Sequence, residues 1–333
     1  MSIRILAGDC RETLRTLPEA SVHCCVTSPP YFGLRDYGNP AQIGLEPTPS
    51  EYVAQMVEVF REVRRVLRDD GTLWLNLGDS YAANRGSGAS GIGAKQATNA
   101  GANLGKLTVP DGLKVKDLIG IPWRVAFALQ ADGWYLRQDI IWHKPNPMPE
   151  SVRDRCTKAH EYVFLLSKSE RYYYDLQAMQ EPAIYTGLTG QDASGFKDAE
   201  NYGGKHDSFK REDSKRAEVI PGQAVGTHRA DREESSYDTA TRNKRSVWTI
   251  ATKPFSEAHF ATMAPELAET CIKAGCPEGG TVLDPFGGAG TTGLVADQLQ
   301  CDAVLCELNP EYIAIAQRRI AGDAPLFASV EVA

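Results

Sequence analysis

Residues 284–293 of the 333-residue chain read DPFGGAGTTG, and their pattern indicates the architecture of the sequence around them. The apolar run TVLDPF at 281–286 predicts a strand, and GAGTTGLVADQLQ at 288–300 predicts the helix that follows it. Between them, three glycines give the spacing G-x-G-x-x-G. A strand, a glycine turn and a helix in this order typically hold a nucleotide at the start of the helix.

Two acids beside this turn indicate which nucleotide it holds. Glu307 ends the next predicted strand, CDAVLCE at 301–307, where a carboxylate can hydrogen-bond a ribose. Asp284 directly precedes the glycines, where its charge would repel a pyrophosphate held at the helix N-terminus. The pair therefore favours S-adenosylmethionine, which has a ribose, a sulfonium and an ammonium but no phosphate. An oxidoreductase that uses a dinucleotide is the less favoured alternative, because only the glycine spacing supports it.

Strands and helices alternate on both sides of this unit. Ser50 is the predicted cap of one helix, Asp70-Gly71 is a predicted turn, and Asn309-Pro310 is the predicted start of the last helix. The alternation predicts an α/β chain with a mostly parallel sheet. Apolar runs predict the other strands at 3–7, 22–28, 72–77, 134–143 and 161–167, and apolar periodicity predicts the other helices at 10–17, 50–67, 120–131, 259–275 and 311–320.

Two stretches interrupt this pattern. Residues 83–106 are rich in Gly, Ala, Ser and Asn and have few large apolar side chains, which predicts a long mobile loop or a disordered segment. Residues 176–245 are polar, with mixed charge and weak periodicity. They predict either an inserted module with a small core or loops that become ordered on a partner.

The overall composition is that of a globular protein. Hydrophobic residues make up 42% and charged residues 24% of the chain, and no apolar run has the length of a membrane span. The N-terminus lacks the features of a signal peptide, so we expect a cytoplasmic protein, encoded by a prokaryote or a phage. A net charge of −7 argues against a basic coat for nucleic acid but leaves room for a local basic cleft. The eight cysteines contain no CxxC pair, so buried thiols are favoured over a metal site.

A second motif, TSPPY at 27–31, follows the apolar run VHCCV. Its two prolines exclude a helix and hold the backbone rigid. An exocyclic amine of a nucleic-acid base is a poor nucleophile, because its lone pair is delocalised into the ring. The Ser28 hydroxyl and the Pro29 carbonyl can accept the amine hydrogens and localise that lone pair. Tyr31 can stack on the base once the base has been flipped out of the double helix.

Together the two motifs resemble those of the amino-methylating DNA methyltransferases, the N4-cytosine and N6-adenine enzymes. TSPPY is similar to their catalytic motif, an Asp, Asn or Ser followed by Pro-Pro and an aromatic residue, which implies a catalytic role for Ser28, Pro29, Pro30 and Tyr31. DPFGGAGTT is similar to their cofactor motif, ILAGDC to the segment near the adenine, and HFATMAPEL to the segment over the methionine part. The cofactor-binding residues that the resemblance implies are Asp9, Cys10, His259, Phe260, Asp284, Phe286, Gly288, Gly290, Thr291, Thr292 and Glu307.

The order of the motifs resembles that of the permuted β group of this family, because the catalytic motif comes first. IIWHKPNPMP at 140–149 and HEYVFLLSK at 160–168 resemble two further family blocks. The resemblance implies the fold of S-adenosylmethionine-dependent methyltransferases, a seven-stranded, mostly parallel sheet with helices on both faces. It also implies three parts: a catalytic part at 1–175 with a mobile loop at 83–115, an inserted target-recognition region at 176–245, and a cofactor-binding part at 246–325.

The target base is less firmly indicated than the reaction. Serine in the first position of the catalytic motif favours N4-cytosine methylation, and N6-adenine methylation by the same mechanism is the alternative. Methylation of cytosine C5 is disfavoured, because it needs a thiolate nucleophile and the chain has no Pro-Cys pair. Amino-methylation of RNA or of a protein glutamine, and a catalytically inactive DNA-binding module, are further alternatives.

Double-stranded DNA is the partner that the resemblance implies, and several residues are candidates to contact it. Lys144 and Asn146 lie in a proline-rich segment, where a rigid loop can hold a lysine against a phosphate. Arg242, Lys244 and Arg245 form a basic cluster with little acid nearby. The sequence leaves open the recognition site, a homodimer and a restriction endonuclease partner.

Overall fold

The computed structural model describes residues 1–37, 39–82, 109, 112–182, 241–253, 255, 262–323 and 329–333. The chain divides into two compact units, Met1–Met179 together with Arg245–Ala333, and Gln180–Lys244. The predictions of a mobile loop at 83–115 and of a recognition region at 176–245 fall mostly on residues outside this description. His259 and Phe260 also lie outside the described residues.

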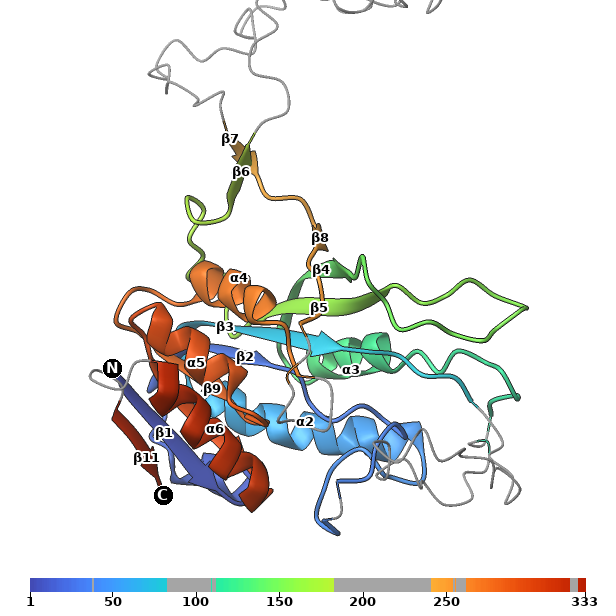
Figure 1. Ribbon diagram of the computed structural model, residues 1–333, viewed down its shortest axis with the longest axis horizontal. Coiled ribbons are helices and arrows are strands. Elements are labelled where there is room, and N and C mark those ends of the chain that lie inside the picture. The colour runs from blue at the N-terminus through green and yellow to red at the C-terminus, as the bar shows by residue number, and fades with distance from the viewer. Residues whose placement is uncertain are drawn as a thin grey trace, which may run out of the picture. The chain divides into compact units, whose positions relative to one another are not determined.

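A nine-stranded sheet forms the centre of the first unit (Figure 1), in the order β11-β1-β10-β9-β2-β3-β5-β4-β8. Neighbouring strands are parallel except for the two pairings of β5, with β3 and with β4. The prediction of a mostly parallel sheet is confirmed. Among the described residues the sheet has nine strands rather than seven, because β8 and β11 extend its two edges. The strands are β1 (Ser2–Ala7), β2 (Val22–Thr27), β3 (Leu67–Leu77), β4 (Tyr135–His143), β5 (His160–Ser167), β8 (Val247–Thr249), β9 (Thr281–Asp284), β10 (Asp302–Glu307) and β11 (Ser329–Val332).

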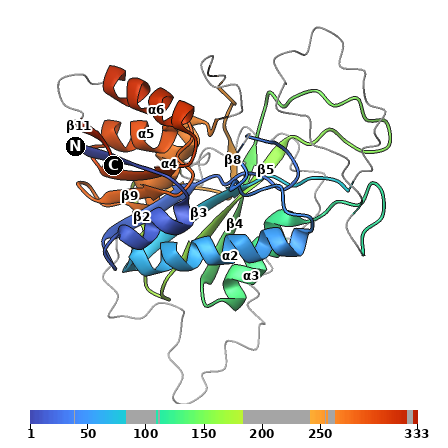
Figure 2. The same cartoon turned by 90° about the horizontal axis from the view of Figure 1, so that it is seen from below.

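Helices cover both faces of this sheet, as predicted. Figure 2 shows α2 and α3 on one face and α4, α5 and α6 on the other. Strand β10 illustrates the packing: Val304 and Cys306 join the core that contains α2, whereas Ala303 and Leu305 join the core that contains α4 and α6. Alternate side chains of a fully buried strand thus face two hydrophobic cores. The helices are α1 (Cys10–Thr13), α2 (Pro49–Val66), α3 (Ile121–Ala131), α4 (Pro265–Gly275), α5 (Thr291–Gln298) and α6 (Pro310–Asp323), with a 3₁₀ turn at Leu14–Thr16.

Helix α2 is capped by Thr48 rather than by Ser50. The Thr48 hydroxyl accepts the Glu51 N–H at 3.2 Å, and the Glu51 carboxylate accepts the Thr48 N–H at 3.0 Å. Pro49 takes the first helical position, where no intrahelical bond needs its missing N–H. This reciprocal capping fixes the start of the helix, so Ser50 lies inside it.

Two other boundaries differ from the predictions. Asp70 and Gly71 lie inside β3 rather than in a turn, because the ladder with β2 passes from the Val22–Leu67 pair to the Cys24–Thr72 pair through an irregularity. Helix α4 begins at Pro265 rather than at 259, since a proline lacks the N–H that would bond to an earlier turn.

The described part of the second unit is an antiparallel pair of short strands, β6 (Gln180–Pro182) and β7 (Thr241–Asn243). Arg242 Nε donates to Glu181 Oε1 across this pair at 2.9 Å. The role of this region in target recognition stays a prediction.

Three chemical features of the described residues bear on the class of protein. None of the helices in these residues has both the length and the apolar character needed to cross a membrane. All eight cysteines are free thiols, and all but Cys156 are buried. The His, Cys, Asp and Glu side chains in the described ranges form no group of three that could hold a metal ion.

Candidate active site

One pocket joins the two sequence motifs at the carboxyl ends of β1, β2, β9 and β10. Ser28 and Pro30 line it from the end of β2, and Gly287–Ala289 line it from the turn after β9. Motifs from opposite ends of the chain therefore meet in one cavity. Other residues predicted to bind the cofactor also line it: Asp9, Cys10, Asp284, Phe286, Thr291, Thr292 and Glu307.

The two central glycines of the turn have different functions. Gly290 has a φ of +77° and caps α5 in the left-handed conformation. A Cβ atom at Gly290 would lie 2.8 Å from Ala316 Cβ, so this glycine lets α6 pack closely and does not itself line the pocket. Gly288 has a φ of +50° and open space beside it, and it faces the pocket.

Glu307 binds the glycine turn with one carboxylate oxygen and the backbone after β10 with the other. Its Oε2 accepts the Gly288 N–H at 2.7 Å, and its Oε1 accepts the Asn309 N–H at 2.8 Å. Burial raises the pKa of Glu307. A carboxylate has about four lone-pair sites, so both oxygens retain capacity for ribose hydroxyls. The geometry is compatible with the predicted ribose contact.

Asp284 forms hydrogen bonds with residues of both the catalytic motif and the cofactor motif. Its side chain is only 3% exposed. It accepts hydrogen bonds from Thr27 Oγ1 at 2.6 Å, from Thr292 Oγ1 at 2.7 Å and from the Phe286 N–H at 3.0 Å. Burial raises the pKa of Asp284, although these hydrogen bonds oppose the rise. Asp284 therefore contributes hydrogen bonds that hold the site together, in addition to its negative charge.

Asp9 and Cys10 lie where the chain leaves β1. Asp9 caps α1 by accepting the Arg11 N–H at 2.9 Å, and its carboxylate also binds the Arg11 guanidinium. Burial by itself would raise the pKa of Asp9, but the hydrogen bonds and the charge of Arg11 outweigh it and lower that pKa. Burial raises the pKa of the Cys10 thiol. An approach of Asp9 to the adenine stays a prediction.

The charged residues that line the pocket can be compared with the charge of S-adenosylmethionine. The described lining contains the acids Asp9, Asp284 and Glu307 but no Lys, Arg or His. That balance suits a cation and opposes a pyrophosphate. Apolar surface from Phe286 and Tyr312 suits the faces of an adenine ring. The residues present therefore fit S-adenosylmethionine, which when bound supplies a methyl group.

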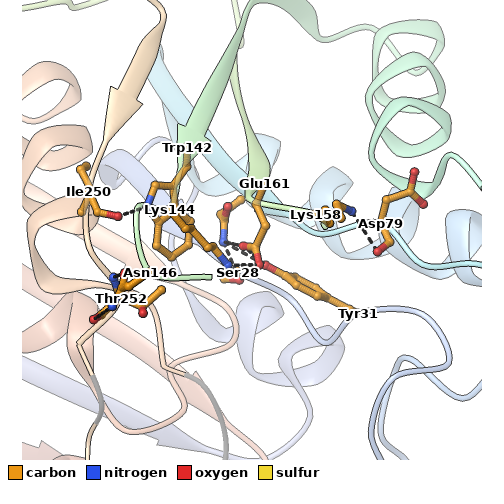
Figure 3. Close-up of polar contacts among 11 residues, drawn as sticks. Ser28, Tyr31, Asp79, Trp142, Lys144, Asn146, Lys158, Glu161, Ile250 and Thr252 are labelled. Atoms are coloured by element: carbon orange, nitrogen blue, oxygen red, sulfur yellow. Dashed lines mark hydrogen bonds and ion pairs between the residues drawn. The ribbon is translucent and has the colours of Figure 1, made fainter. Parts of the chain in front are cut away.

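A second polar cluster surrounds the catalytic motif (Figure 3). Ser28 Oγ lies 3.3 Å from Tyr31 Oη, which donates to Glu161 Oε2 at 2.7 Å. Asn76 Nδ2 lies within hydrogen-bonding distance of all three side chains, at 3.2 Å from Ser28, 3.0 Å from Tyr31 and 3.1 Å from Glu161, and shares its two hydrogens among them. Burial and the charge of Glu161 raise the pKa of Tyr31. The Tyr31 ring packs against Gly78, where a Cβ atom would lie 2.4 Å from Tyr31 Cε2.

Glu161 and Asn76 were not among the predicted site residues. Strand β5 runs antiparallel to β3 and pairs Tyr162 with Leu77, so the start of β5 lies beside the end of β3. Glu161 is a single acid that opens the apolar strand HEYVFLLS, and Asn76 is a single amide in the buried run TLWLNL. A lone polar residue in a buried strand was the signal available in the sequence, because such a residue needs partners.

The residues predicted to contact DNA differ in their exposure and in their partners within the protein. Lys144 is 18% exposed, pairs with Glu161 and lies 4.3 Å above the Trp142 ring, and its contact with a phosphate stays a prediction. Asn146 exchanges two hydrogen bonds with the backbone of Thr252, at 3.2 and 3.0 Å. Arg245 is exposed. Arg242 and Lys244 belong to the other compact unit, and Arg242 pairs with Glu181.

Comparison with known proteins identifies the family. The model of a DNA methylase family, the N6/N4 methylases, matches residues 22–318. The Type II methyltransferase M.Cfr9I of Citrobacter freundii is 45% identical over 320 residues, which cover 96% of this chain and 88% of the relative. The cytosine-N4-specific PvuII DNA methyltransferase has the same fold, with a TM-score of 0.59 at 20% identity over 96% of this chain and 87% of that one. TTHA0409 of Thermus thermophilus, in complex with S-adenosyl-L-methionine, has a TM-score of 0.54 at 24% identity over 99% of each chain. The chain belongs to the N6/N4 family of DNA methylases and is an S-adenosylmethionine-dependent DNA methyltransferase.

Proposed function

We propose that this enzyme methylates N4 of cytosine at a specific site in double-stranded DNA. The observation that carries the proposal is the position of Ser28, which lies in the TSPPY motif and lines the cofactor pocket. Serine at this position of the family motif is more typical of N4-cytosine than of N6-adenine enzymes. The PvuII enzyme, which shares the fold, is described as cytosine-N4-specific. N6-adenine methylation remains the second candidate, because the same acceptors suit either amine.

The rigidity of the catalytic turn supports amine activation. Tyr52, which is fully buried, donates its hydroxyl to the Pro30 carbonyl at 2.8 Å. Together with the two prolines, this bond fixes the backbone that carries the Ser28 hydroxyl and the Pro29 carbonyl. Acceptors that are already in place need no reorganisation when the amine becomes nucleophilic. We propose that a flipped base presents its amine to these two groups and that Tyr31 contacts the base.

The test identifies the methylated nucleoside directly. The enzyme and a labelled methyl donor are incubated in parallel with duplex DNA of mixed sequence, with RNA and with protein. The labelled DNA is digested and its nucleosides are separated. We expect N4-methyldeoxycytidine from the DNA arm only, and its loss with Ser28→Ala. Label in N6-methyldeoxyadenosine would select the second candidate, and label confined to RNA or protein would refute the proposal.

We propose further that residues 176–245 read the DNA sequence. Replacing this segment by that of a relative with a different recognition site should change the site that is methylated but not the base. An unchanged site after the exchange would place recognition elsewhere in the chain. Because M.Cfr9I is a bacterial Type II methyltransferase, we propose that the enzyme acts in the cytoplasm beside its DNA.

A further inference from the structure

A line of hydrogen bonds leads from the cofactor pocket to a carboxylate outside it. Ser28 lines the pocket, and its hydroxyl donates to Tyr31 Oη at 3.3 Å. Tyr31 Oη in turn donates to Glu161 Oε2 at 2.7 Å (Figure 3). Glu161 does not line the pocket, and its side chain is 16% exposed. Two hydroxyl groups thus connect the site of the target amine to an acid with access to solvent.

Asn76 gives this line a direction. Its Nδ2 group lies 3.2, 3.0 and 3.1 Å from the oxygens of Ser28, Tyr31 and Glu161 and has two hydrogens to share among them. Because this nitrogen donates and does not accept, the hydroxyl hydrogens of Ser28 and Tyr31 are left to point onward to the next oxygen of the line. Burial raises the pKa of the Tyr31 phenol, so this hydroxyl keeps its proton and can only pass one through.

Methylation of an amine requires a proton to leave, and the inference rests on the proposed transfer to an exocyclic amine. S-adenosylmethionine supplies the methyl group, and its sulfur keeps the electron pair of the broken carbon–sulfur bond. We propose that Glu161 is the final acceptor of the amine proton, reached through Ser28 and Tyr31. The amine N–H bond breaks as Ser28 Oγ gains that proton. Ser28 passes its own proton to Tyr31 Oη, and Tyr31 passes its own to Glu161 Oε2, so both hydroxyls end as they began.

Lys144 forms an ion pair with Glu161, the last residue of this line of hydrogen bonds. Its ammonium group pairs with Glu161 Oε1, the oxygen that Tyr31 does not use. The ammonium also lies 4.3 Å above the Trp142 ring, which fixes its position. When Glu161 takes up the proton, its exposed edge can release that proton to water, which restores the carboxylate for the next turnover.

The test compares variants of this line in single turnovers with saturating DNA and cofactor. Glu161→Gln has nearly the same shape but no basic carboxylate, and Tyr31→Phe keeps the ring but not the hydroxyl. We expect each to slow methyl transfer roughly 100-fold, within the range of proton-transfer catalysis. The double variant should be no slower than the slower single variant, because both changes interrupt the same line. Glu161→Asp, which retains a carboxylate, should recover part of the rate lost in Glu161→Gln.

Two further measurements show whether Glu161→Gln slows the reaction by removing a proton acceptor or by disturbing the structure of the site. The fluorescence of 2-aminopurine placed beside the target base reports flipping, and calorimetry reports cofactor affinity. Both should be unchanged in Glu161→Gln. Lys144→Met added to Glu161→Gln removes the stranded ammonium, and it should not restore the rate. A rate for Glu161→Gln within threefold of wild type, additive losses, restoration by Lys144→Met, or lost flipping would each overturn the proposal. A wild-type enzyme that transfers no methyl group to DNA amines would refute the proposed function instead.

Discussion

The Thr27 hydroxyl donates a 2.6 Å hydrogen bond to Asp284 Oδ1, and both residues are buried. Thr27 ends β2 directly before Ser28, and Asp284 ends β9 directly before the glycine turn. Thr292, in α5, donates to the other oxygen of the same carboxylate at 2.7 Å. One buried acid therefore sets the position of the proposed catalytic motif relative to the cofactor pocket.

Asp284→Asn should lower both stability and cofactor affinity. The amide has one acceptor oxygen where the carboxylate has two, so one threonine hydroxyl loses a charged partner, at a cost of about 1–3 kcal/mol in the free energy of unfolding. Cofactor affinity should fall because the pocket, which suits a cation, loses one of the three acidic side chains in its described lining. Urea unfolding and calorimetry measure the two effects, and an unchanged affinity would contradict the electrostatic argument.

The stability loss in Asp284→Asn should shrink as the pH rises. Burial raises the pKa of Asp284 in the folded protein above its ordinary value of 3.8, so its contribution to stability is greatest below that value and is lost as the pH rises through the folded pKa. Asparagine does not ionise and shows no such loss. Unfolding of both proteins at a series of pH values from about 4 upward checks this trend, and a constant difference would exclude it.

Gly290→Ala should destabilise the fold, whereas Gly288→Ala should mainly weaken cofactor binding. A methyl group at Gly290 would lie 2.8 Å from Ala316 Cβ, and the φ of +77° is unfavourable for alanine. We expect a loss of about 2–4 kcal/mol from strain and overpacking together. Alanine at Gly288 also carries backbone strain, since its φ is +50°, but the nearest atom is 3.9 Å away, so the methyl group causes no overpacking and enters the pocket instead. Thermal unfolding and calorimetry on both variants compare these effects, and equal stabilities would contradict the assignment.

Glu307→Gln should weaken cofactor binding roughly 10- to 100-fold, the cost of losing hydrogen bonds to a charged group. One carboxylate oxygen becomes an amide nitrogen that faces the Gly288 or the Asn309 N–H. The same measurement with a 2′-deoxyribose analogue of the cofactor is the control. A smaller loss with the analogue is expected if Glu307 binds the ribose, and an equal loss would show that it acts only on the turn.

Gly78→Ala should impair methyl transfer with little change in cofactor affinity. The new methyl group would come within 2.4 Å of Tyr31 Cε2, while Glu161 and Asn76 hold the Tyr31 hydroxyl in place. The ring must therefore move out of position, and we expect a rate at least ten times lower, about 1.4 kcal/mol of activation free energy. Tyr31→Ala with and without Gly78→Ala is the control, since the second change should add nothing once the ring is gone.

The main elements of the fold could be predicted because each has its own local pattern. The apolar runs of β2, β5 and β10 and the periodicity of α2 required no knowledge of their neighbours. The edge strands β8 and β11 were missed, because each is short and neither belongs to a continuous apolar run like the one that marks β9. The start of α4 was placed too early, since the apolar pattern continues upstream of Pro265 while the backbone bonding does not.

The candidate site could be predicted where its residues belong to a local motif or end a predicted strand. The TSPPY and DPFGGAGTT motifs supply Ser28, Pro30 and most of the lining between 284 and 292, and Asp9 and Glu307 lie at strand ends. Glu161 meets Tyr31 from 130 positions away, and Asp284 meets Thr27 from 257 positions away, so no local pattern contains either contact. Stacking of Tyr31 on a base stays a prediction, and the structure adds the anchors that hold the ring.

The reversed direction of β5 has a consequence for how this architecture can change. Parallel strands deliver only their carboxyl ends to the pocket edge, but β5 delivers its beginning, so Glu161 directly follows the connection at 144–159. The ladder between β4 and β5 pairs Glu161 with Trp142, so the sheet holds the acid in register while the connection before it can vary in length. Changes in the outer surface of that connection would then occur beside the acid without moving it.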